Sequence, residues 1–171
     1  MLDALTERFA DWRLGIRTRR STPAIGGGAK AGDPTPYPAL FRAARTLGPA
    51  DVVYDVGCGS GRACAVFATT GARVTGIELS AEAAGIARRN RVTVIVGDAR
   101  SADYASVTAL WMFNPFGPEA LRAVLRRANS PRVLYYNASD QHRAVLFDEG
   151  YAAHDSTLVG DYALLDCRRT G

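Results

Sequence analysis

The apolar and polar residues of this chain form short apolar runs that alternate with amphipathic stretches. The apolar runs are bounded by turn residues and predict strands near 51–56, 73–78, 92–96, 108–113, 132–136, 151–156 and 161–168. Apolar residues at helical spacing predict helices near 2–16, 39–47, 61–70, 81–90, 117–128 and 139–149. Strands and helices therefore alternate through most of the chain, as in an α/β protein.

Repeated strand–helix units predict a mainly parallel sheet with helices on both faces, because parallel neighbours are joined by right-handed crossovers. The last two predicted strands are separated only by Leu158, Val159 and Gly160 and have no helix between them. They are expected to form a hairpin that makes one edge of the sheet antiparallel. The predicted fold class is a doubly wound α/β fold with a seven-stranded, mainly parallel sheet and an antiparallel C-terminal hairpin.

The N-terminal part of the chain has a different pattern. Apolar residues recur at helical spacing from Leu2 to Ile16 and predict an amphipathic helix. Residues 21–38 are rich in glycine and proline, which indicates a linker or a lid. We therefore divide the chain into residues 1–36, an N-terminal helix with a basic Gly/Pro-rich lid or linker, and residues 37–171, a single folded domain.

Composition limits the class of protein. The chain has 171 residues, of which 47% are hydrophobic and 22% charged, and this is enough for one globular domain with a full core. No run approaches the roughly 18 apolar residues of a membrane span, and the N-terminus has no signal-peptide core, so we expect a cytoplasmic protein without a membrane partner. The three cysteines lack metal-ligand spacing, so we expect free thiols and no metal site.

The charge is unevenly distributed. The net charge is +4, and one stretch between Trp12 and Gly32 contains no acid but holds five basic residues, Arg13, Arg17, Arg19, Arg20 and Lys30. Such a segment either meets an anionic partner or is a solvated arm. Both interpretations stay open at the level of sequence.

The strongest chemical signal is a glycine-rich turn after the predicted strand at 51–56. Gly57, Gly59 and Gly61 let the backbone turn sharply and approach a ligand, because no Cβ stands in the way. The dinucleotide fingerprint fails, since the glycine that it requires is absent in both possible registers. Asp55 precedes the first glycine by two residues, which suits a ligand with an ammonium group and no pyrophosphate. The alternative is a tight strand-to-helix turn without a ligand.

S-adenosylmethionine (SAM) is a ligand of that kind, and the segment resembles the first motif of class I SAM-dependent methyltransferases, an acidic residue followed by Gly-x-Gly-x-Gly. The resemblance covers Tyr37 to Arg169. It implies a Rossmann-like fold, SAM as the cofactor with S-adenosylhomocysteine as its product, and methyl transfer as the reaction. The cofactor-binding residues that it implies are Asp55, Gly57, Cys58, Gly59, Gly61, Glu78, Leu79, Asp98, Ala99 and Asn114.

Two acids follow the next two predicted strands. Glu78 closes the strand at 73–78, where a carboxylate can accept hydrogen bonds from both ribose hydroxyls, although it could instead cap the helix after Ser80. Dinucleotide enzymes also have an acid at this position, so Glu78 indicates nucleoside binding but does not distinguish SAM from a dinucleotide. Asp98 follows the third strand; the resemblance places it near the adenine amino group, and otherwise it is a turn aspartate.

The fourth predicted strand ends in Asn114, Pro115, Phe116 and Gly117. Ligands of open α/β sheets bind beyond the carboxyl ends of the strands, so these residues are expected at the reaction site, unless they only end the strand with a turn. The segment resembles the Asn-Pro-Pro-Tyr motif of amino-group methyltransferases, in which the Asn side chain and the next carbonyl accept hydrogen bonds from a planar amino group. Here Phe116 and Gly117 depart from that pattern. Asn114, Pro115 and Phe116 are the predicted catalytic residues.

The predicted substrate-binding residues are Tyr37, Phe116, Tyr136 and Asn137. Tyr136 and Asn137 end the fifth predicted parallel strand, where they either contact the acceptor or pack and cap the following helix. Tyr37 would be the inner end of the lid, near the cofactor.

Methyl transfer from a sulfonium is a direct displacement, so the protein mainly aligns the nucleophile and excludes water. A neutral amine or amide needs only positioning, whereas a hydroxyl acceptor would need a base. The sequence shows no unambiguous base, because His142 and His154 lie outside the motifs and are expected at the surface.

Three functions remain open at this stage. The first is methyl transfer to a small molecule, a protein or a nucleic acid, with the acceptor unidentified. The second is a SAM-binding protein with other chemistry or a regulatory role. The third is a basic nucleic-acid-binding module with a purely structural glycine turn, for which the sequence shows no aromatic-and-basic recognition motif. The sequence does not indicate an oligomeric state.

Overall fold

The computed structural model describes residues 2–18 and 34–170. Most of the Gly/Pro-rich segment that we predicted as a lid or linker lies outside the described residues, and so do Arg19, Arg20 and Lys30 of the basic stretch.

The helices of the described chain are α1 (Leu2–Leu14), α2 (Tyr37–Ala44), α3 (Arg62–Ala68), α4 (Ala81–Arg89), the short 3-10 helix η1 (Ala99–Ser101), α5 (Pro118–Ala128) and α6 (Asp140–Asp148). The strands are β1 (Val52–Val56), β2 (Arg73–Glu78), β3 (Val94–Val96), β4 (Ala109–Phe113), β5 (Arg132–Tyr136), β6 (Tyr151–Val159) and β7 (Tyr162–Arg169). In these two ranges no helix has the length and apolar character needed to cross a membrane.

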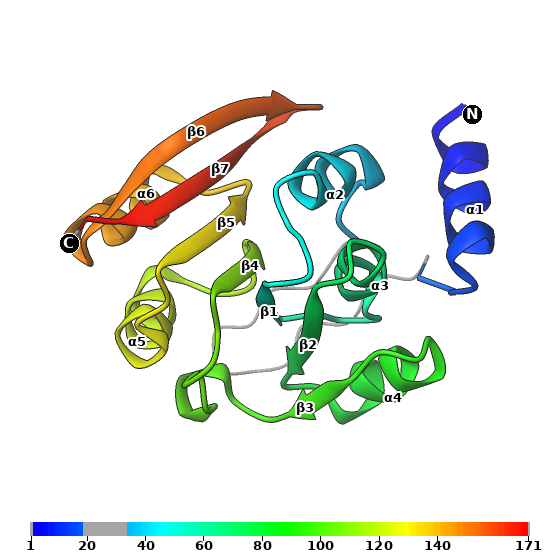
Figure 1. The fold of residues 1–171 in the computed structure, drawn as a ribbon, viewed down its shortest axis with the longest axis horizontal. Coiled ribbons are helices and arrows are strands. Elements are labelled where there is room, and N and C mark those ends of the chain that lie inside the picture. Colours follow the sequence, from blue (N-terminus) through cyan, green and yellow to red (C-terminus); the bar gives the residue numbers. More distant parts are fainter. Residues whose placement is uncertain (1, 19–33, 171) are drawn as a thin grey trace.

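The strands form one seven-stranded sheet in the order β3-β2-β1-β4-β5-β7-β6 (Figure 1). Strands β1 to β5 pair parallel with one another, and β7 pairs antiparallel with both β5 and β6. The turn between β6 and β7 contains only Gly160 and Asp161, and Gly160 adopts a left-handed φ of 62°. This arrangement confirms the predicted Rossmann-like α/β fold with an antiparallel C-terminal hairpin.

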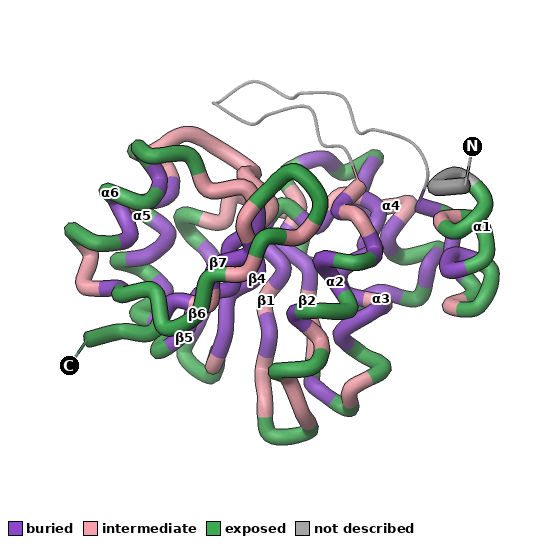
Figure 2. The backbone as a smooth tube through the Cα atoms, turned by 90° about the horizontal axis from the view of Figure 1, so that it is seen from above, coloured by how far each residue is buried: buried purple, intermediate pink, exposed green. Residues whose placement is uncertain are grey.

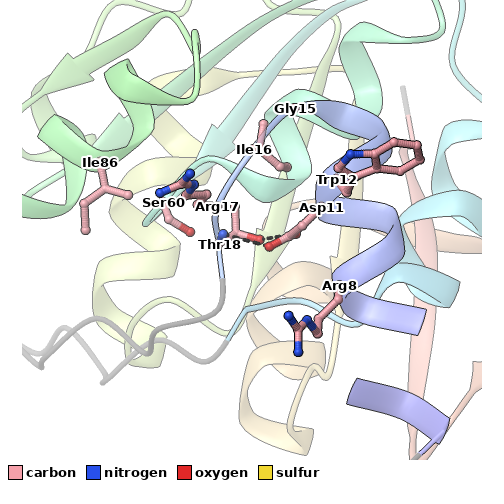
Figure 3. A pocket seen from close by; sticks show the side chains of 9 residues that line it. All are labelled: Arg8, Asp11, Trp12, Gly15, Ile16, Arg17, Thr18, Ser60 and Ile86. Carbon is pink, nitrogen blue, oxygen red and sulfur yellow. Dashed lines mark hydrogen bonds between the residues drawn. The ribbon is translucent and has the colours of Figure 1, made fainter. Parts of the chain in front are cut away.

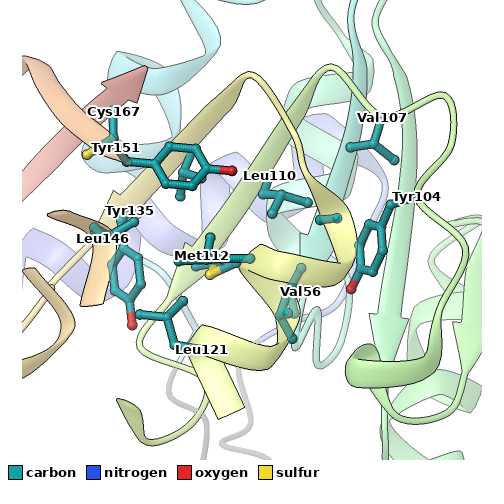
Figure 4. Packing of buried hydrophobic residues seen from close by; sticks show 14 of the residues in the cluster. Val56, Tyr104, Val107, Leu110, Met112, Leu121, Tyr135, Leu146, Tyr151 and Cys167 are labelled. Atoms are coloured by element: carbon teal, nitrogen blue, oxygen red, sulfur yellow. The ribbon is translucent and has the colours of Figure 1, made fainter. Parts of the chain in front are cut away.

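The core lies on both faces of the sheet because side chains alternate between the faces along each strand. On β4, Ala109 and Trp111 pack in the cluster that contains α2 and α3, whereas Leu110 and Met112 pack in the cluster that contains α5 and α6 (Figure 4). All four are at most 1% exposed. A backbone view coloured by burial shows buried residues along the strands and exposed residues on the outer sides of the helices (Figure 2).

Helix α1 is oriented differently from what its apolar stripe suggests. Leu5, Phe9 and Trp12 are 62%, 61% and 72% exposed, so most of the predicted stripe faces solvent. The inner face instead presents Glu7 and Asp11, which pair with the buried guanidinium of Arg62 at the start of α3. Ion pairing therefore sets the orientation of α1, and the apolar stripe does not.

Candidate active site

The chain passes from β1 to α3 through the glycine turn predicted from the sequence. Gly57, Gly59 and Gly61 have φ angles of 77°, 53° and 85°, in the left-handed region that residues with a Cβ rarely adopt. At Gly61 space is limiting too, because a Cβ there would lie 2.7 Å from Cγ2 of Val92. The three glycines are therefore required by the backbone geometry of the turn.

This turn lies directly against the loop that follows β4. A Cβ placed on Gly57 would lie only 2.7 Å from Cβ of Pro115. Strands β1 and β4 are parallel neighbours, so their carboxyl ends meet at the same edge of the sheet. The fold thus brings the first glycine of the turn beside the predicted catalytic residues Asn114, Pro115 and Phe116.

Asp55 lies beneath the turn and is 4% exposed. Its Oδ2 accepts a hydrogen bond from Sγ of Cys64 in α3, at 3.3 Å. Burial, opposed by the hydrogen bond from Cys64 and assisted by the negative charge of Glu78, raises the pKa of Asp55 to about 7. The side chain that we predicted to suit an ammonium group is thus a buried carboxyl in contact with α3.

Cys58 contributes its main chain to the turn, while its side chain packs inward. The residue is 8% exposed, and a Cβ on Gly76 of β2 would lie 2.8 Å from Cβ of Cys58. Cys58 and Cys64 belong to one small buried cluster with Val92. A ligand above the turn would therefore meet the backbone of Cys58 and not its thiol.

Glu78 joins the end of β2 to the glycine turn. One carboxylate oxygen accepts the backbone N–H of Gly59 and the other that of Ser80, each at 2.8 Å. Ser80 itself caps α4 by accepting the N–H of Ala83, so the capping role considered for Glu78 belongs to Ser80. A carboxylate oxygen has a second lone pair, so both oxygens of Glu78 can also accept a hydroxyl proton.

Asp98 and its neighbours lie at the ends of β2 and β3. Oδ1 of Asp98 accepts the backbone N–H of Arg100 at 2.8 Å, and Oδ2 lies 2.5 Å from Nη2 of the same arginine. These hydrogen bonds lower the pKa of Asp98. Leu79 is 44% exposed and offers apolar surface at the end of β2, and Ala99 begins η1 and packs at the edge of the core.

The loop after β4 is strained at its first residue and anchored at its third. Asn114 adopts a φ of 45°, and such left-handed non-glycine residues cluster at functional sites. The carbonyl oxygen of Phe116 lies 3.0 Å from Nε2 of His142, and Nδ1 of His142 lies 2.8 Å from Oγ of Ser139. His142 also stacks on Tyr135 with ring centroids 5.6 Å apart.

The surface position expected for His142 is therefore wrong: the residue is only 2% exposed. It lies on α6, which packs against α5, and this packing brings the imidazole to the Phe116 carbonyl. Sequence reasoning missed this role because the two residues are 26 positions apart. His154 on β6 is exposed, as expected.

Tyr136 and Asn137 occupy the end of β5. Tyr136 is 1% exposed, and its hydroxyl donates a hydrogen bond to the carbonyl of Val159 at 2.8 Å. Its ring lies beside Phe113 of β4, with centroids 5.2 Å apart. Asn137 adopts a left-handed φ of 62°, and its N–H donates to the carbonyl of Ala163. Tyr136 thus packs between strands, and Asn137 is a partly exposed turn residue at the edge that carries the site.

Tyr37 begins α2 and is 1% exposed. Its hydroxyl donates a hydrogen bond to Asp11, and the guanidinium of Arg62 lies 4.5 Å from its ring centroid. Arg62 also donates to Oγ of Thr18 at 2.7 Å and to the carbonyl of Thr35 at 3.1 Å. Tyr37 is therefore part of a buried polar cluster next to the glycine turn, and sequence reasoning missed the central residue of that cluster, Arg62.

Comparisons with known proteins agree with this geometry. Residues 53–131, which include the glycine turn and the loop after β4, match the family model of a methyltransferase domain. A search of curated protein sequences found no match.

Solved structures share the fold. An RNA methyltransferase from Salinibacter ruber in complex with S-adenosyl-L-homocysteine is 24% identical, with a TM-score of 0.65 over 81% of this chain and 95% of that chain. PH1948 from Pyrococcus horikoshii, provisionally assigned as an RNA methyltransferase, is 18% identical, with a TM-score of 0.73 over 96% of each chain. A Burkholderia thailandensis 1,6-didemethyltoxoflavin-N1-methyltransferase is 21% identical, with a TM-score of 0.61 over 78% of this chain and 79% of that chain. Residues 53–131 thus match a methyltransferase domain, on a fold that this chain shares with solved methyltransferases, one of them in complex with S-adenosyl-L-homocysteine.

Proposed function

We propose that this chain transfers the methyl group of SAM to a nitrogen atom of a planar amino or amide group, held at Asn114, Pro115 and Phe116. The observation that carries the proposal is the contact between Gly57 and Pro115, which joins the glycine turn to the loop after β4. A cofactor on that turn and an acceptor on that loop would be immediate neighbours.

The residues at the turn fit SAM. Three left-handed glycines leave the backbone of the turn free of Cβ atoms, so a ligand can approach it closely. Glu78 offers two carboxylate oxygens to a ribose diol, and the exposed side chain of Leu79 offers apolar surface to a flat base. When bound, SAM supplies a methyl group activated by a sulfonium.

The loop after β4 supports an acceptor with N–H donors. A planar amino group carries two donors, and we assign the Asn114 side chain and the Pro115 carbonyl as their acceptors. His142 engages the Phe116 carbonyl and thereby holds the end of the loop in place. The Burkholderia enzyme, named as an N1-methyltransferase, is a precedent for nitrogen methylation on this fold.

Nitrogen is also favoured because it needs no protein base. The nitrogen of a planar amino or amide group attacks with its own lone pair, which hydrogen bonds from its N–H groups help to localise, and it loses one proton to water after transfer, whereas a hydroxyl must be deprotonated first. Asp55 is buried beneath the turn, and Nε2 of His142 contacts the Phe116 carbonyl, so neither is placed to take a proton from an acceptor. The protein would act by aligning the acceptor nitrogen with the S–methyl bond and by excluding water.

The experiment uses SAM carrying a ¹³C-labelled methyl group, with a metabolite extract and total RNA offered separately as acceptors. Release of S-adenosylhomocysteine measures turnover, and the carbon chemical shift of the product distinguishes N-methyl from O-methyl and S-methyl groups. We expect an N-methyl product that disappears with Asn114→Gly, a variant that keeps the left-handed backbone while removing the side chain.

An O-methyl or S-methyl product would contradict nitrogen chemistry while retaining methyl transfer. SAM binding by calorimetry without any methylated product in either pool would instead support a SAM-binding protein with other chemistry or a regulatory role.

A further inference from the structure

The charges of α1 and the residues that follow it are separated between two sides. Glu7 and Asp11 lie on the inner side, where both pair with the buried guanidinium of Arg62. Arg8, Arg13 and Arg17 are exposed, and no described carboxylate lies within salt-bridge distance of them. The outer side is therefore basic even though the helix sequence contains acids.

Two aromatic side chains share this outer side. Phe9 is 61% and Trp12 72% exposed, and their ring centroids are 5.8 Å apart. Exposure of a Trp–Phe pair is costly, since each ring would gain by leaving water. The other tryptophan of the chain, Trp111, is 1% exposed in the core, so Trp12 is the tryptophan that solvent can reach.

A pocket of about 590 Å³ opens beside these residues (Figure 3). Arg8, Asp11 and Trp12 of α1 contribute to its wall, and so do Arg17 of the segment that follows α1, Ser60 of the glycine turn and Ile86 of α4. Pockets of roughly 300–1,000 Å³ suit small ligands or a single group of a larger one. Ser60 belongs to the glycine turn, so the pocket reaches from the aromatic and basic face of α1 to the edge of the cofactor site.

We propose that this face and pocket bind single-stranded nucleic acid. Bases stack on exposed aromatic rings whatever their sequence, and arginines pair with the phosphates between them. Arg8, Arg13 and Arg17 supply the positive charge, Phe9 and Trp12 the stacking surface, and the pocket space for one unstacked base. The structure thereby supplies the aromatic-and-basic combination that the sequence pattern alone did not reveal.

A membrane surface fits the observations less well. A helix that lies on a membrane buries a wide apolar face and needs no cavity. Among the described side chains of α1, the exposed apolar residues Leu5, Phe9 and Trp12 form a single row flanked by the exposed Arg8 and Arg13. Here Trp12 borders a pocket whose wall includes the polar residues Asp11, Thr18 and Ser60. Asp11 and Thr18 are hydrogen-bonded to each other, and the hydroxyl of Ser60 is the group that offers a hydrogen bond to a base or a sugar. The binding step is independent of the proposed methyl transfer. Whether the bound strand is also the methyl acceptor rests on that proposed function.

Binding is measured without SAM, so that failure of methyl transfer and failure of this inference are distinguishable. The probe is a fluorescein-labelled 12-nucleotide oligouridylate, followed by anisotropy and by quenching of tryptophan fluorescence. Trp12→Ala is expected to weaken binding about tenfold, the typical loss of one stacked base. Arg8→Ala with Arg17→Ala is expected to reduce the slope of log K against log salt by about 1.4, the loss of two phosphate contacts.

Matched controls lie elsewhere on the surface. Phe147 on α6 is 78% exposed and Arg73 begins β2, so Phe147→Ala and Arg73→Ala remove an exposed aromatic ring and an exposed arginine away from α1. Both are expected to bind like the unchanged protein. Because Trp12 is mostly exposed, its replacement should leave the thermal midpoint unchanged.

Equal losses in the α1 variants and the controls would overturn the proposal, since they would show nonspecific attraction to a basic protein. Absence of binding to the oligouridylate would overturn it as well. Quenching of Trp12 by anionic phospholipid vesicles, or self-association that Trp12→Ala abolishes, in place of oligonucleotide binding would assign the face to a membrane or to a second copy of the chain.

Discussion

Nε2 of His142 lies 3.0 Å from the carbonyl oxygen of Phe116, on the loop that we assign to the acceptor. A carbonyl oxygen only accepts hydrogen bonds, so Nε2 carries the proton in this contact. The histidine thus acts as a donor that positions the loop, and its other nitrogen is engaged by Ser139.

Replacing His142 should therefore disturb the loop more than the cofactor. His142→Ala is expected to lower kcat while SAM affinity stays within about twofold, and to cost about 1–3 kcal/mol of stability through the unpaired carbonyl. Steady-state kinetics, SAM calorimetry and thermal unfolding check these effects. His154→Ala, at an exposed position, is the control. Loss of SAM binding with unchanged kcat would show that His142 serves the cofactor side.

Gly57→Ala should impair the turn by two separate effects. The residue has a φ of 77°, which costs an L-residue roughly 1–2 kcal/mol, and its Cβ would lie 2.7 Å from Cβ of Pro115. We expect a lower thermal midpoint and at least tenfold weaker SAM binding. Gly48→Ala is the control, because a Cβ at Gly48 meets no atom within 4 Å. If Gly57→Ala binds SAM with unchanged affinity, the glycine turn and the loop after β4 can move apart without weakening cofactor binding.

Glu78→Ala should weaken SAM binding by about 1–3 kcal/mol, the usual loss of a charged hydrogen-bond acceptor. Because Glu78 also holds the N–H groups of Gly59 and Ser80, thermal stability should fall too. Glu78→Gln keeps one acceptor oxygen and should show a smaller loss. Calorimetry distinguishes a cofactor ligand from a residue that only supports the glycine turn. If Glu78→Ala binds SAM as tightly as the unchanged protein, Glu78 only supports the turn. Glu82→Gln, exposed in the first turn of α4, serves as the control.

Asp55 should make the stability of the protein depend on pH. Burial raises its pKa to about 7 from an ordinary value of 3.8, so between these values the folded state binds more protons than the unfolded state. The free energy of unfolding should therefore fall as the pH rises from about 4 to about 7, and level off above that. Asp55→Asn imitates the protonated acid and should remove this part of the pH dependence. If the thermal midpoints of the unchanged protein and of Asp55→Asn change with pH in the same way from pH 4 to 8, Asp55 is not the source of the pH dependence.

Arg62→Ala should release α1 from the body of the protein. The change leaves Asp11, which is 5% exposed, without its guanidinium partner, and breaking a buried ion pair typically costs about 3–5 kcal/mol. Limited proteolysis should then cut near α1 earlier than in the unchanged protein, as thermal unfolding shifts downward. Arg88→Ala, at an exposed position on α4, is the control and should change neither the rate of proteolysis near α1 nor the thermal midpoint.

The sequence predicted the parallel strands well because they are short apolar runs bounded by turn residues, whereas the more polar β6 runs to Val159, beyond the predicted 151–156. The limits of β2 and β5 agree with the predicted 73–78 and 132–136. The glycine turn was recognisable for a similar reason, since only glycine readily supplies three left-handed residues.

Contacts between distant parts of the chain were not recognisable. The orientation of α1 depends on Arg62, and the burial of His142 depends on how α5 and α6 pack. Local periodicity carries no information on either contact. Periodicity therefore led us to expect an ordinary amphipathic helix, and the position of His142 outside the motifs led us to expect a surface residue.

Asn90 connects two parts of the molecule through one amide group. Its Nδ2 donates to the carbonyl of Ser60 at 2.9 Å, and its Oδ1 accepts the N–H of Arg17 at 3.0 Å. A ligand that displaces Ser60 therefore acts through Asn90 on the chain that follows α1. Thermodynamic reciprocity requires the converse in equal measure: any factor by which SAM changes the affinity of the α1 face for its ligand is the factor by which that ligand changes the affinity for SAM.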